Sequence, residues 1–319
     1  MIITVTMNPA VDKTIELSTF VHGDLNRIEN VVLDAGGKGI NVSKTIQALG
    51  GKSFATGFLG GRNGDYIQDI LHKLSIETDF VKIEEETRVN TKIVETAGLV
   101  TELNEKGPLI DLYAMSELIL KLTGYLKDDS LLVLSGSIPL GVPKTIYKSL
   151  TELAHEMGAK VLVDADGELF KEALAAKPDI VKPNQAELEK YFGYPMDTDK
   201  KILEAGGKLL EKGVKNVIIS LGADGAYFMD KEHTLYSPAL SVQVNSTVGA
   251  GDAMVAAFSY GIDQGLSFEE TAKLAMATAI GAVTTVGTKP PRLEVVKELF
   301  DQVTMVKKFL KDEKAIEKK

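Results

Sequence analysis

The sequence predicts an α/β fold, in which a mostly parallel central sheet is flanked by helices and carries a small inserted antiparallel sheet. Short β-branched runs alternate with helical stretches along most of the chain, which is typical of βαβ units. Two polar segments with strand-like alternation, 14–33 and 88–103, interrupt this pattern. Because α/β folds often exceed about 250 residues as one unit, we expect the 319 residues to form a single domain, 1–319.

The elements of the α/β body follow from this alternation. Gly158 and Gly213 stand just after two expected helices, where glycine often ends a helix. The weakly polar stretch 274–287 is shorter than the roughly 20 residues that a membrane-spanning helix needs, so we expect a buried helix there. The charged tail, 307–319, is expected to fray. Strands are predicted at 2–6, 131–134, 160–164, 180–182 and 217–220, and helices at 42–49, 145–157, 169–175, 186–192 and 202–212.

The two interrupting segments are expected to form a small subdomain, built from about 13–34 and 88–104. Turn-forming residues occur within each segment, at His22-Gly23-Asp24 and at Ala97-Gly98. A small sheet with one uncovered face either closes over a cleft or pairs with another subunit. The sequence therefore predicts a β-lid, and it leaves open a homodimer formed through that lid.

The composition excludes several classes of function. The chain has 36 Lys and Arg against 45 Asp and Glu, and its net charge of −9 supplies no basic surface for nucleic acid or for an anionic membrane. The absence of cysteine excludes disulfides and thiolate zinc sites. Together with the lack of a signal-peptide pattern, these features favour a cytoplasmic protein. Any anionic substrate would need a local cationic pocket.

The strongest local signal is the segment 244–254, VNSTVGAGDAM, which predicts a strand, a glycine-rich turn and a helix of small residues. The backbone N–H groups of Gly249, Ala250 and Gly251 would converge at the N terminus of that helix, where they can bind an anion. Asp252 would lie beside them, placed to accept a proton from a hydroxyl that attacks a phosphoryl group. The alternative is that Asp252 only complements the helix dipole.

A second glycine-rich segment, GGKGIN at 36–41, opens another expected helix. Gly37 would let the backbone approach a ligand closely, and Lys38 would supply a mobile positive charge for a phosphate or a sugar. The segment lacks the GxxxxGK[ST] spacing of a P-loop. The alternative is a tight turn, with Asn41 near the start of the helix and Lys38 in solvent.

Two further segments stand at the ends of expected strands. Asn184 and Glu187, which follow Lys182, have the spacing of a helix N-cap and its partner. The pair could also orient a Mg²⁺-bound water beside a nucleotide, because Mg²⁺ is often held by one or two carboxylates plus phosphates. The segment SLGADGA at 220–226 joins two apolar strands, and its glycines either admit a nucleotide or form a plain hairpin.

Four basic residues in and near the inserted sheet are candidates for binding a phosphorylated substrate. Arginine offers a bidentate fork to phosphate, whereas lysine offers a mobile point charge. The alternative is that each of them is simply solvated. These residues are Arg27, Lys38, Arg88 and Lys92.

Taken together, these segments resemble the PfkB carbohydrate kinases, a family with the ribokinase-like fold. The resemblance covers essentially the whole chain, because five segments occur in the order and spacing of the family. They are TVTMNPAVD at 4–12, GGKGIN at 36–41, KPNQAELE at 182–189, SLGADGA at 220–226 and VNSTVGAGD at 244–252. The phosphosugar branch of the family is indicated by NPAVD at 8–12, ETRVNTK at 86–92 and TELNEKGP at 101–108.

The resemblance implies a role for each candidate residue. The catalytic base falls on Asp252, and the anion-binding turn falls on Gly249, Ala250 and Gly251. ATP and Mg²⁺ are the implied cofactors, with Glu187 on the metal side, acting through water. The implied sugar-binding residues are Asp12, Arg27, Gly37, Lys38, Asn41, Arg88, Lys92 and Ser137, and the implied nucleotide-binding residues are Lys182, Asn184, Ser220, Gly222 and Gly225.

The implied reaction is ATP-dependent phosphorylation of a ketohexose monophosphate. Fructose 1-phosphate is the first expectation, with tagatose 6-phosphate or fructose 6-phosphate as alternatives. A catalytically silent sugar-phosphate sensor is an alternative of another class, although a sensor has no need of the base Asp252. Many family members have Asp-Thr ahead of the GAGD turn, where this chain has Asn245-Ser246, so no monovalent-cation site is carried over.

Overall fold

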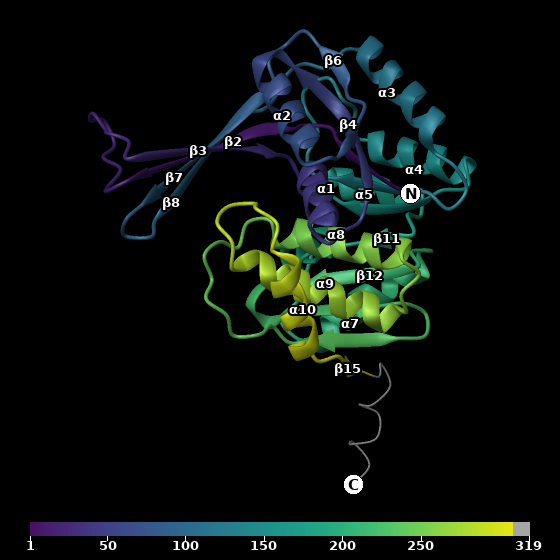
Figure 1. Ribbon diagram of the computed structural model, residues 1–319. Coiled ribbons are helices and arrows are strands. Elements are labelled where there is room, and N and C mark those ends of the chain that lie inside the picture. Colours follow the sequence, from purple (N-terminus) through teal and green to yellow (C-terminus); the bar gives the residue numbers. More distant parts are fainter. Residues whose placement is uncertain (309–319) are drawn as a thin grey trace.

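The computed structural model describes residues 1–308, which form a large mixed sheet, a separate four-stranded sheet and flanking helices (Figure 1). All pairings in the large sheet from β12 to β5 are parallel, and β13, β14 and β15 extend one edge with antiparallel pairings. The prediction of a mostly parallel sheet is confirmed. In spatial order the strands are β15 (Val306–Lys307), β14 (Thr234–Ser237), β13 (Ala226–Met229), β12 (Asn216–Ser220), β11 (Ile180–Val181), β10 (Lys160–Asp164), β9 (Leu131–Ser135), β1 (Ile2–Thr6), β4 (Ser53–Gly60) and β5 (Glu77–Thr78), and β6 (Val81–Ile83) also pairs with β4.

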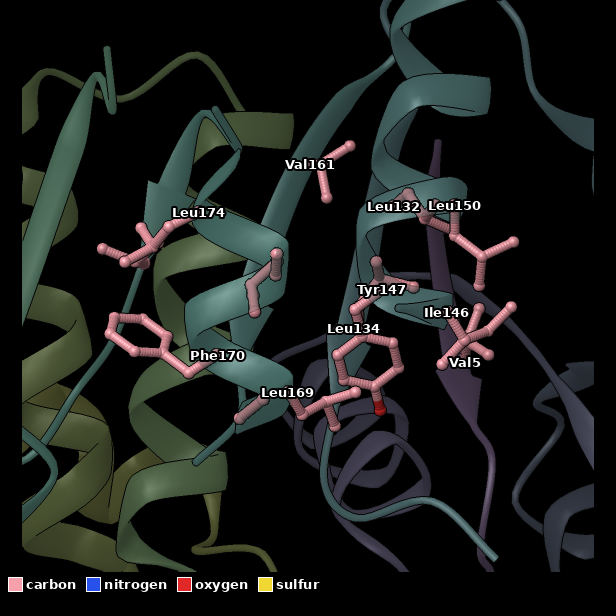
Figure 2. Packing of buried hydrophobic residues seen from close by; sticks show 14 of the residues in the cluster. Val5, Leu132, Leu134, Ile146, Tyr147, Leu150, Val161, Leu169, Phe170 and Leu174 are labelled. Atoms are coloured by element: carbon pink, nitrogen blue, oxygen red, sulfur yellow. The ribbon is translucent and has the colours of Figure 1, made fainter. Parts of the chain in front are cut away.

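Helices cover both faces of this sheet, because its parallel strands are apolar on both sides. Along β9, Leu132 and Leu134 face one helical layer, and Leu131 and Val133 face the other. The first layer contains α3 (Leu112–Tyr125), α4 (Ile146–Glu156), α5 (Gly167–Ala175), α6 (Gln185–Phe192) and α7 (Asp199–Glu211), and the second contains α1 (Lys38–Ala48), α8 (Ala250–Asp263), α9 (Phe268–Val283) and α10 (Leu293–Gln302). Figure 2 shows the first layer, where side chains of α4 and α5 meet those of β1, β9 and β10.

The small sheet, for which we keep the name lid, projects from the body (Figure 1). Its strands, in spatial order, are β3 (Asn30–Gly36), β2 (Ala10–Leu17), β7 (Arg88–Glu95) and β8 (Val100–Asn104), and α2 (Gly61–Lys73) packs against its base. The pairings β2–β3 and β7–β8 are antiparallel, as predicted, but β2 and β7 are parallel. Both β2 and β7 leave strands of the main sheet, β1 and β6, and run outward, so they lie side by side in the same direction.

The structure corrects three local expectations. No strand precedes the glycine turn at 249–251, because the N–H groups of Asn245 and Ser246 bond to the carbonyl of Val283 at the end of α9 instead of to a strand. Helix α1 begins at Lys38, earlier than predicted. Lys307 pairs in β15, and the rest of the predicted tail beyond residue 308 lies outside the described residues. Among residues 1–308, no helix is both long and apolar enough to cross a bilayer.

Candidate functional site

A cavity of about 1120 Å³ lies between the lid, the carboxyl ends of the main strands and the N terminus of α8. Ser135, Asp164 and Ser220, which end β9, β10 and β12, all line it. Ligands of open α/β sheets commonly bind at this edge. All but one of the predicted site residues line the cavity: Asp12, Gly37, Lys38, Asn41, Arg88, Lys92, Ser137, Lys182, Asn184, Glu187, Ser220, Gly222, Gly225, Gly249, Ala250, Gly251 and Asp252.

Arg27 is the predicted site residue that the structure does not bring to this cavity. It is exposed in the connection between β2 and β3, at the outer end of the lid, and it is not among the lining residues. Asp12, Arg88 and Lys92 lie on the strands β2 and β7 and line the cavity, whereas Arg27 lies in the connection that follows β2. A contact between Arg27 and the substrate therefore stays a prediction.

Asp252 lies in the first turn of α8 with only 7 % of its surface exposed. The side-chain amide of Asn41, from α1, donates a 2.9 Å hydrogen bond to its Oδ2. Burial raises the pKa of Asp252 to about 6, and the charge of Asp164 adds to this effect. The pKa of Asp252 is lowered, to a smaller extent, by the charge of Lys38, by the hydrogen bond from Asn41 and by the charge of Lys182. A carboxylate with such a pKa is ionised at neutral pH and can still accept a proton efficiently.

The turn before Asp252 presents backbone N–H groups at a helix N terminus. Gly249 has φ +88°, a left-handed conformation that glycine adopts without strain. A Cβ atom at Gly251 would lie 3.3 Å from the Nζ of Lys182, so the ammonium group is close to the turn. The unpaired N–H groups, the helix dipole and this cation together favour an anion.

Asp164 lies at the floor of the cavity between two lysines. Its Oδ1 is 3.1 Å from the Nζ of Lys182, and its Oδ2 is 3.3 Å from the Nζ of Lys38. Asp164 is 1 % exposed, and the two lysines hold its pKa below the ordinary value although burial opposes this. The charge of Asp164 in turn raises the pKa of Lys38. Asp164 thus links the end of β10 with α1 and with the segment that follows β11.

A row of polar side chains crosses the lid above this floor. Asp34, Asp12, Asn90 and Asn104 are directly paired across β3, β2, β7 and β8, and all four line the cavity. The Asn90 amide donates to Asp12 Oδ1 at 3.1 Å. A Cβ atom at Gly36 would lie 2.2 Å from Asp12 Oδ2, so only glycine leaves room for that carboxylate.

Two cations of the lid, Arg88 and Lys92, are already bonded to protein groups. Arg88 donates from Nε and Nη2 to the carbonyl of Asn8, and from Nη1 to Asn90 Oδ1 and the carbonyl of Glu105. These contacts engage four of the five N–H groups of the guanidinium. Its pKa is lowered, chiefly by burial. Lys92 forms a 3.4 Å ion pair with Glu102.

The opposite end of the cavity contains the Asn184–Glu187 pair. The two residues form a capping box at the start of α6, so the capping interpretation is confirmed. Asn184 also pairs with Ser220 in an isolated bridge. Gly225 has φ +96°, and a Cβ atom there would lie 2.0 Å from the carbonyl oxygen of Ser237. Apolar side chains complete this end of the cavity: Leu240, Val242, Val244, Met276, Ala279, Ile280 and Val283.

Comparison with known proteins identifies the family. Residues 5–294 match the model of the pfkB family carbohydrate kinases. The chain belongs to the PfkB family. It is 38 % identical to a 1-phosphofructokinase of Borreliella burgdorferi, with 95 % of this chain and 97 % of the relative covered. It is 32 % identical to a tagatose-6-phosphate kinase of Staphylococcus epidermidis, with 96 % and 99 % covered.

A solved structure extends this relationship to the fold. The Escherichia coli phosphofructokinase-2, in complex with substrates and products, superimposes with a TM-score of 0.90 at 28 % identity, covering 94 % of this chain and 98 % of that one. The ribokinase-like fold is thereby confirmed. The protein is a PfkB sugar-phosphate kinase, and kinases of this family use ATP, typically with Mg²⁺.

Sequence reasoning missed several polar residues that line this cavity. Asp164 could have been suspected, because it is a carboxylate at the end of an apolar strand that was predicted correctly. Asn90, Asn104 and Asp34 could not, since their common row depends on the register of the lid strands.

Proposed function

We propose that this kinase transfers the γ-phosphoryl group of ATP to O6 of fructose 1-phosphate, giving fructose 1,6-bisphosphate and ADP. The observation that carries the proposal is the position of Asp252. Its buried carboxylate follows an anion-binding turn and lies between a lid with cationic residues and a cavity end with apolar walls. Such a placement suits proton removal from a hydroxyl in line with a bound phosphoryl group.

In the proposed chemical step one proton moves, one bond to phosphorus forms and one breaks. Asp252 takes the proton of the sugar hydroxyl, the sugar oxygen bonds to the γ-phosphorus, and the bond from that phosphorus to the β,γ-bridging oxygen breaks. The N–H groups of Gly249, Ala250 and Gly251 would stabilise the negative charge on the transferring group, with help from the Lys182 ammonium. The lid would exclude water, which otherwise competes as the acceptor.

The sugar would bind on the lid side. Asp12, Gly37 and Asn41 would meet its hydroxyls, with Ser137 nearby. Lys38, beside Asp164 on the floor, would also meet a sugar hydroxyl, and Lys92 would face the phosphate that the substrate already carries. Arg88 would contribute mainly its charge and one remaining N–H group, because its other donors hold the protein backbone and Asn90.

The nucleotide would bind at the other end. Lys182, Asn184, Ser220, Gly222 and Gly225 would surround its phosphates and ribose, and the apolar wall would take the base. For Mg²⁺ the donor set fits: Glu187 is a carboxylate that lines the cavity, and the capping bond involves its Oε2. Mg²⁺ usually keeps waters and takes few protein ligands. When bound, it would neutralise charge on the phosphates.

The sugar epimer is the finer question. Tagatose differs from fructose at C4, and tagatose 6-phosphate and fructose 6-phosphate offer the same chemistry with the phosphate at the other end. The similarity to a 1-phosphofructokinase at 38 % identity favours fructose 1-phosphate. ATP and these sugar phosphates are metabolites of the cytosol, so we place the enzyme in the cytoplasm.

We also propose that two copies pair through the lid. Alternation along β3 and β8 puts Leu33 and Leu103 on the face opposite Asp34 and Asn104. Leu33 is 45 % exposed and Leu103 is 56 % exposed. A second copy of this face would cover these side chains. Light scattering that gives the mass of a monomer at micromolar concentration would contradict this proposal.

The test is ADP release with MgATP and a panel of acceptors. The panel contains fructose 1-phosphate, tagatose 1-phosphate, tagatose 6-phosphate, fructose 6-phosphate and free fructose, with Asp252→Asn as the control. A kcat/KM at least tenfold higher for fructose 1-phosphate, about 1.4 kcal/mol of discrimination, supports the proposal. Preference for another phosphosugar would change the substrate, and silence on all five would favour a sensor.

A further inference from the structure

Lys44 is a buried cation that the proposed mechanism does not use. It lies in α1, one turn after Asn41, and its side chain is only 3 % exposed. Its Nζ is 2.8 Å from Oδ2 of Asp34 and donates to the carbonyl of Ala35 at 2.9 Å. A lysine is rarely buried to this degree unless its charge is paired. The ammonium thus ties α1 to the end of β3.

Both partners of Lys44 lie next to the sugar end of the cavity. Asp34 is directly opposite Asp12 in the β2–β3 pairing, and both line the cavity. Directly opposite residues in such a pair have Cβ atoms about 5 Å apart, so two carboxylates repel each other there. Ala35 immediately precedes the turn that contains Gly37, whose φ is +115°.

We propose that Lys44 is a positioning residue for the sugar end of the site, and that Asp34 joins Asp12 in binding the sugar hydroxyls. The buried ammonium balances the two carboxylates and holds the backbone just before the Gly36–Gly37 turn. Asp34 Oδ1 accepts from the N–H of Ala35 and Oδ2 accepts from Lys44, so the carboxylate is fixed, and each oxygen keeps a second lone pair for a sugar hydroxyl. This inference rests on the proposed function, because it takes a polyhydroxylated sugar phosphate as the ligand.

The charged groups around Asp12 give this role a signature in pH. Burial raises the pKa of Asp12 and the Asp34 charge adds to it, whereas the Asn90 bond, Lys44 and Lys92 lower it. Asp34 faces Asp12 from β3, Lys44 from α1, and Lys92 and Arg88 from β7. Removing the Lys44 charge should therefore raise the pKa of Asp12 further, which a merely structural role would not do.

The first test compares Lys44→Met with wild type. We expect KM for fructose 1-phosphate to rise about tenfold, with KM for ATP changed less than twofold. Asp252 should set the acid limb of kcat/KM in wild type. In Lys44→Met this limb should become steeper and move to higher pH, because protonation of Asp12 then contributes to it as well. The matched control is Lys121→Met. Lys121 lies on α3, its Nζ is 2.6 Å from Oδ1 of Asp79, and it does not line the cavity. The control variant should leave both KM values unchanged.

A second variant keeps the test possible if Lys44→Met does not fold. Lys44→Met with Asp34→Asn removes the whole ion pair, a replacement that buried pairs often tolerate. This variant should also show a tenfold higher sugar KM with normal ATP KM. A wild-type sugar KM in either folded variant would overturn the inference, as would an unmoved acid limb in folded Lys44→Met. In the double variant the losses of the Lys44 and Asp34 charges act on Asp12 in opposite directions, so its acid limb should stay near that of wild type. If wild type turns over no member of the acceptor panel, the proposed function fails instead.

Discussion

Replacing Asp252 by asparagine should stabilise the protein while it removes the catalytic base. The native environment raises the pKa of this carboxyl from 3.8 to about 6. Each pH unit corresponds to about 1.4 kcal/mol, so keeping Asp252 ionised in the native state at neutral pH costs about 3 kcal/mol relative to the unfolded chain. Asparagine has nearly the same shape and carries no charge. Its carbonyl oxygen can still accept the bond from the Asn41 amide.

The sign of this effect sets its pH window. Below pH 4 the carboxyl is protonated in both the native and the unfolded protein, so Asp252 causes no destabilisation. As pH rises from about 4 to about 6, the unfolded chain ionises first and the native state loses stability relative to it. The advantage of Asp252→Asn should therefore be small at pH 4, should grow up to about pH 6, and should remain constant above it.

Urea unfolding of both proteins at pH 4.5, 6 and 8 measures this difference. We expect the variant to be more stable by up to about 3 kcal/mol at pH 8, and its kcat to be lower by several powers of ten. Asp263→Asn is a suitable control, because Asp263 is on the same helix and is partly exposed. Equal stability of the variant and wild type at every pH would refute the electrostatic reasoning, and near-normal turnover would refute the assignment of the base.

Three other outcomes follow from the site. In wild type, kcat/KM should fall as pH drops below about 6, since protonated Asp252 cannot act as a base; a profile that is flat to pH 5 would contradict this. Arg88→Ala should raise KM for the phosphosugar at least tenfold with a smaller effect on ATP, and an unchanged sugar KM would remove Arg88 from the phosphate end. Gly225→Ala should raise KM for ATP selectively, because its Cβ would collide with the Ser237 carbonyl, and normal ATP kinetics would place the nucleotide elsewhere.

Much of the fold could be predicted from local signals. The strands 2–6 and 160–164 were predicted with their observed limits, because both are short runs that contain several apolar, mostly β-branched residues. The start of α1 was predicted too late, since Gly37 and Lys38 have no helical hydrophobic pattern. The missing strand before residue 249 shows the limit of local reasoning, because α9 supplies the hydrogen-bond partner of that segment from elsewhere in the chain.

The candidate site residues also fall into two groups, those that the sequence indicates and those that only the structure shows. Residues on contiguous motifs, such as Asp252 and the Asn184–Glu187 pair, could be singled out as candidates from the sequence, and the resemblance to the family then gave Asp252 its expected role. Asp34 and Lys44 could not, because their meaning depends on the register of β2 against β3 and on which face of α1 is buried. Nor could the sequence show that Arg88 spends most of its donors on backbone carbonyls.

These existing partners determine how an acidic chain can bind a doubly anionic substrate. Three cavity lysines, Lys38, Lys92 and Lys182, already have a carboxylate neighbour, but these carboxylates differ in burial. Glu102 is 45 % exposed, so a phosphate can displace it from Lys92 while water solvates the released carboxylate. Asp164 is 1 % exposed and cannot be released in this way, so Lys38 must serve Asp164 and a ligand together. The lid therefore provides an exchangeable cation, whereas the floor provides fixed ones, and phosphate binding should depend on salt mainly through Lys92.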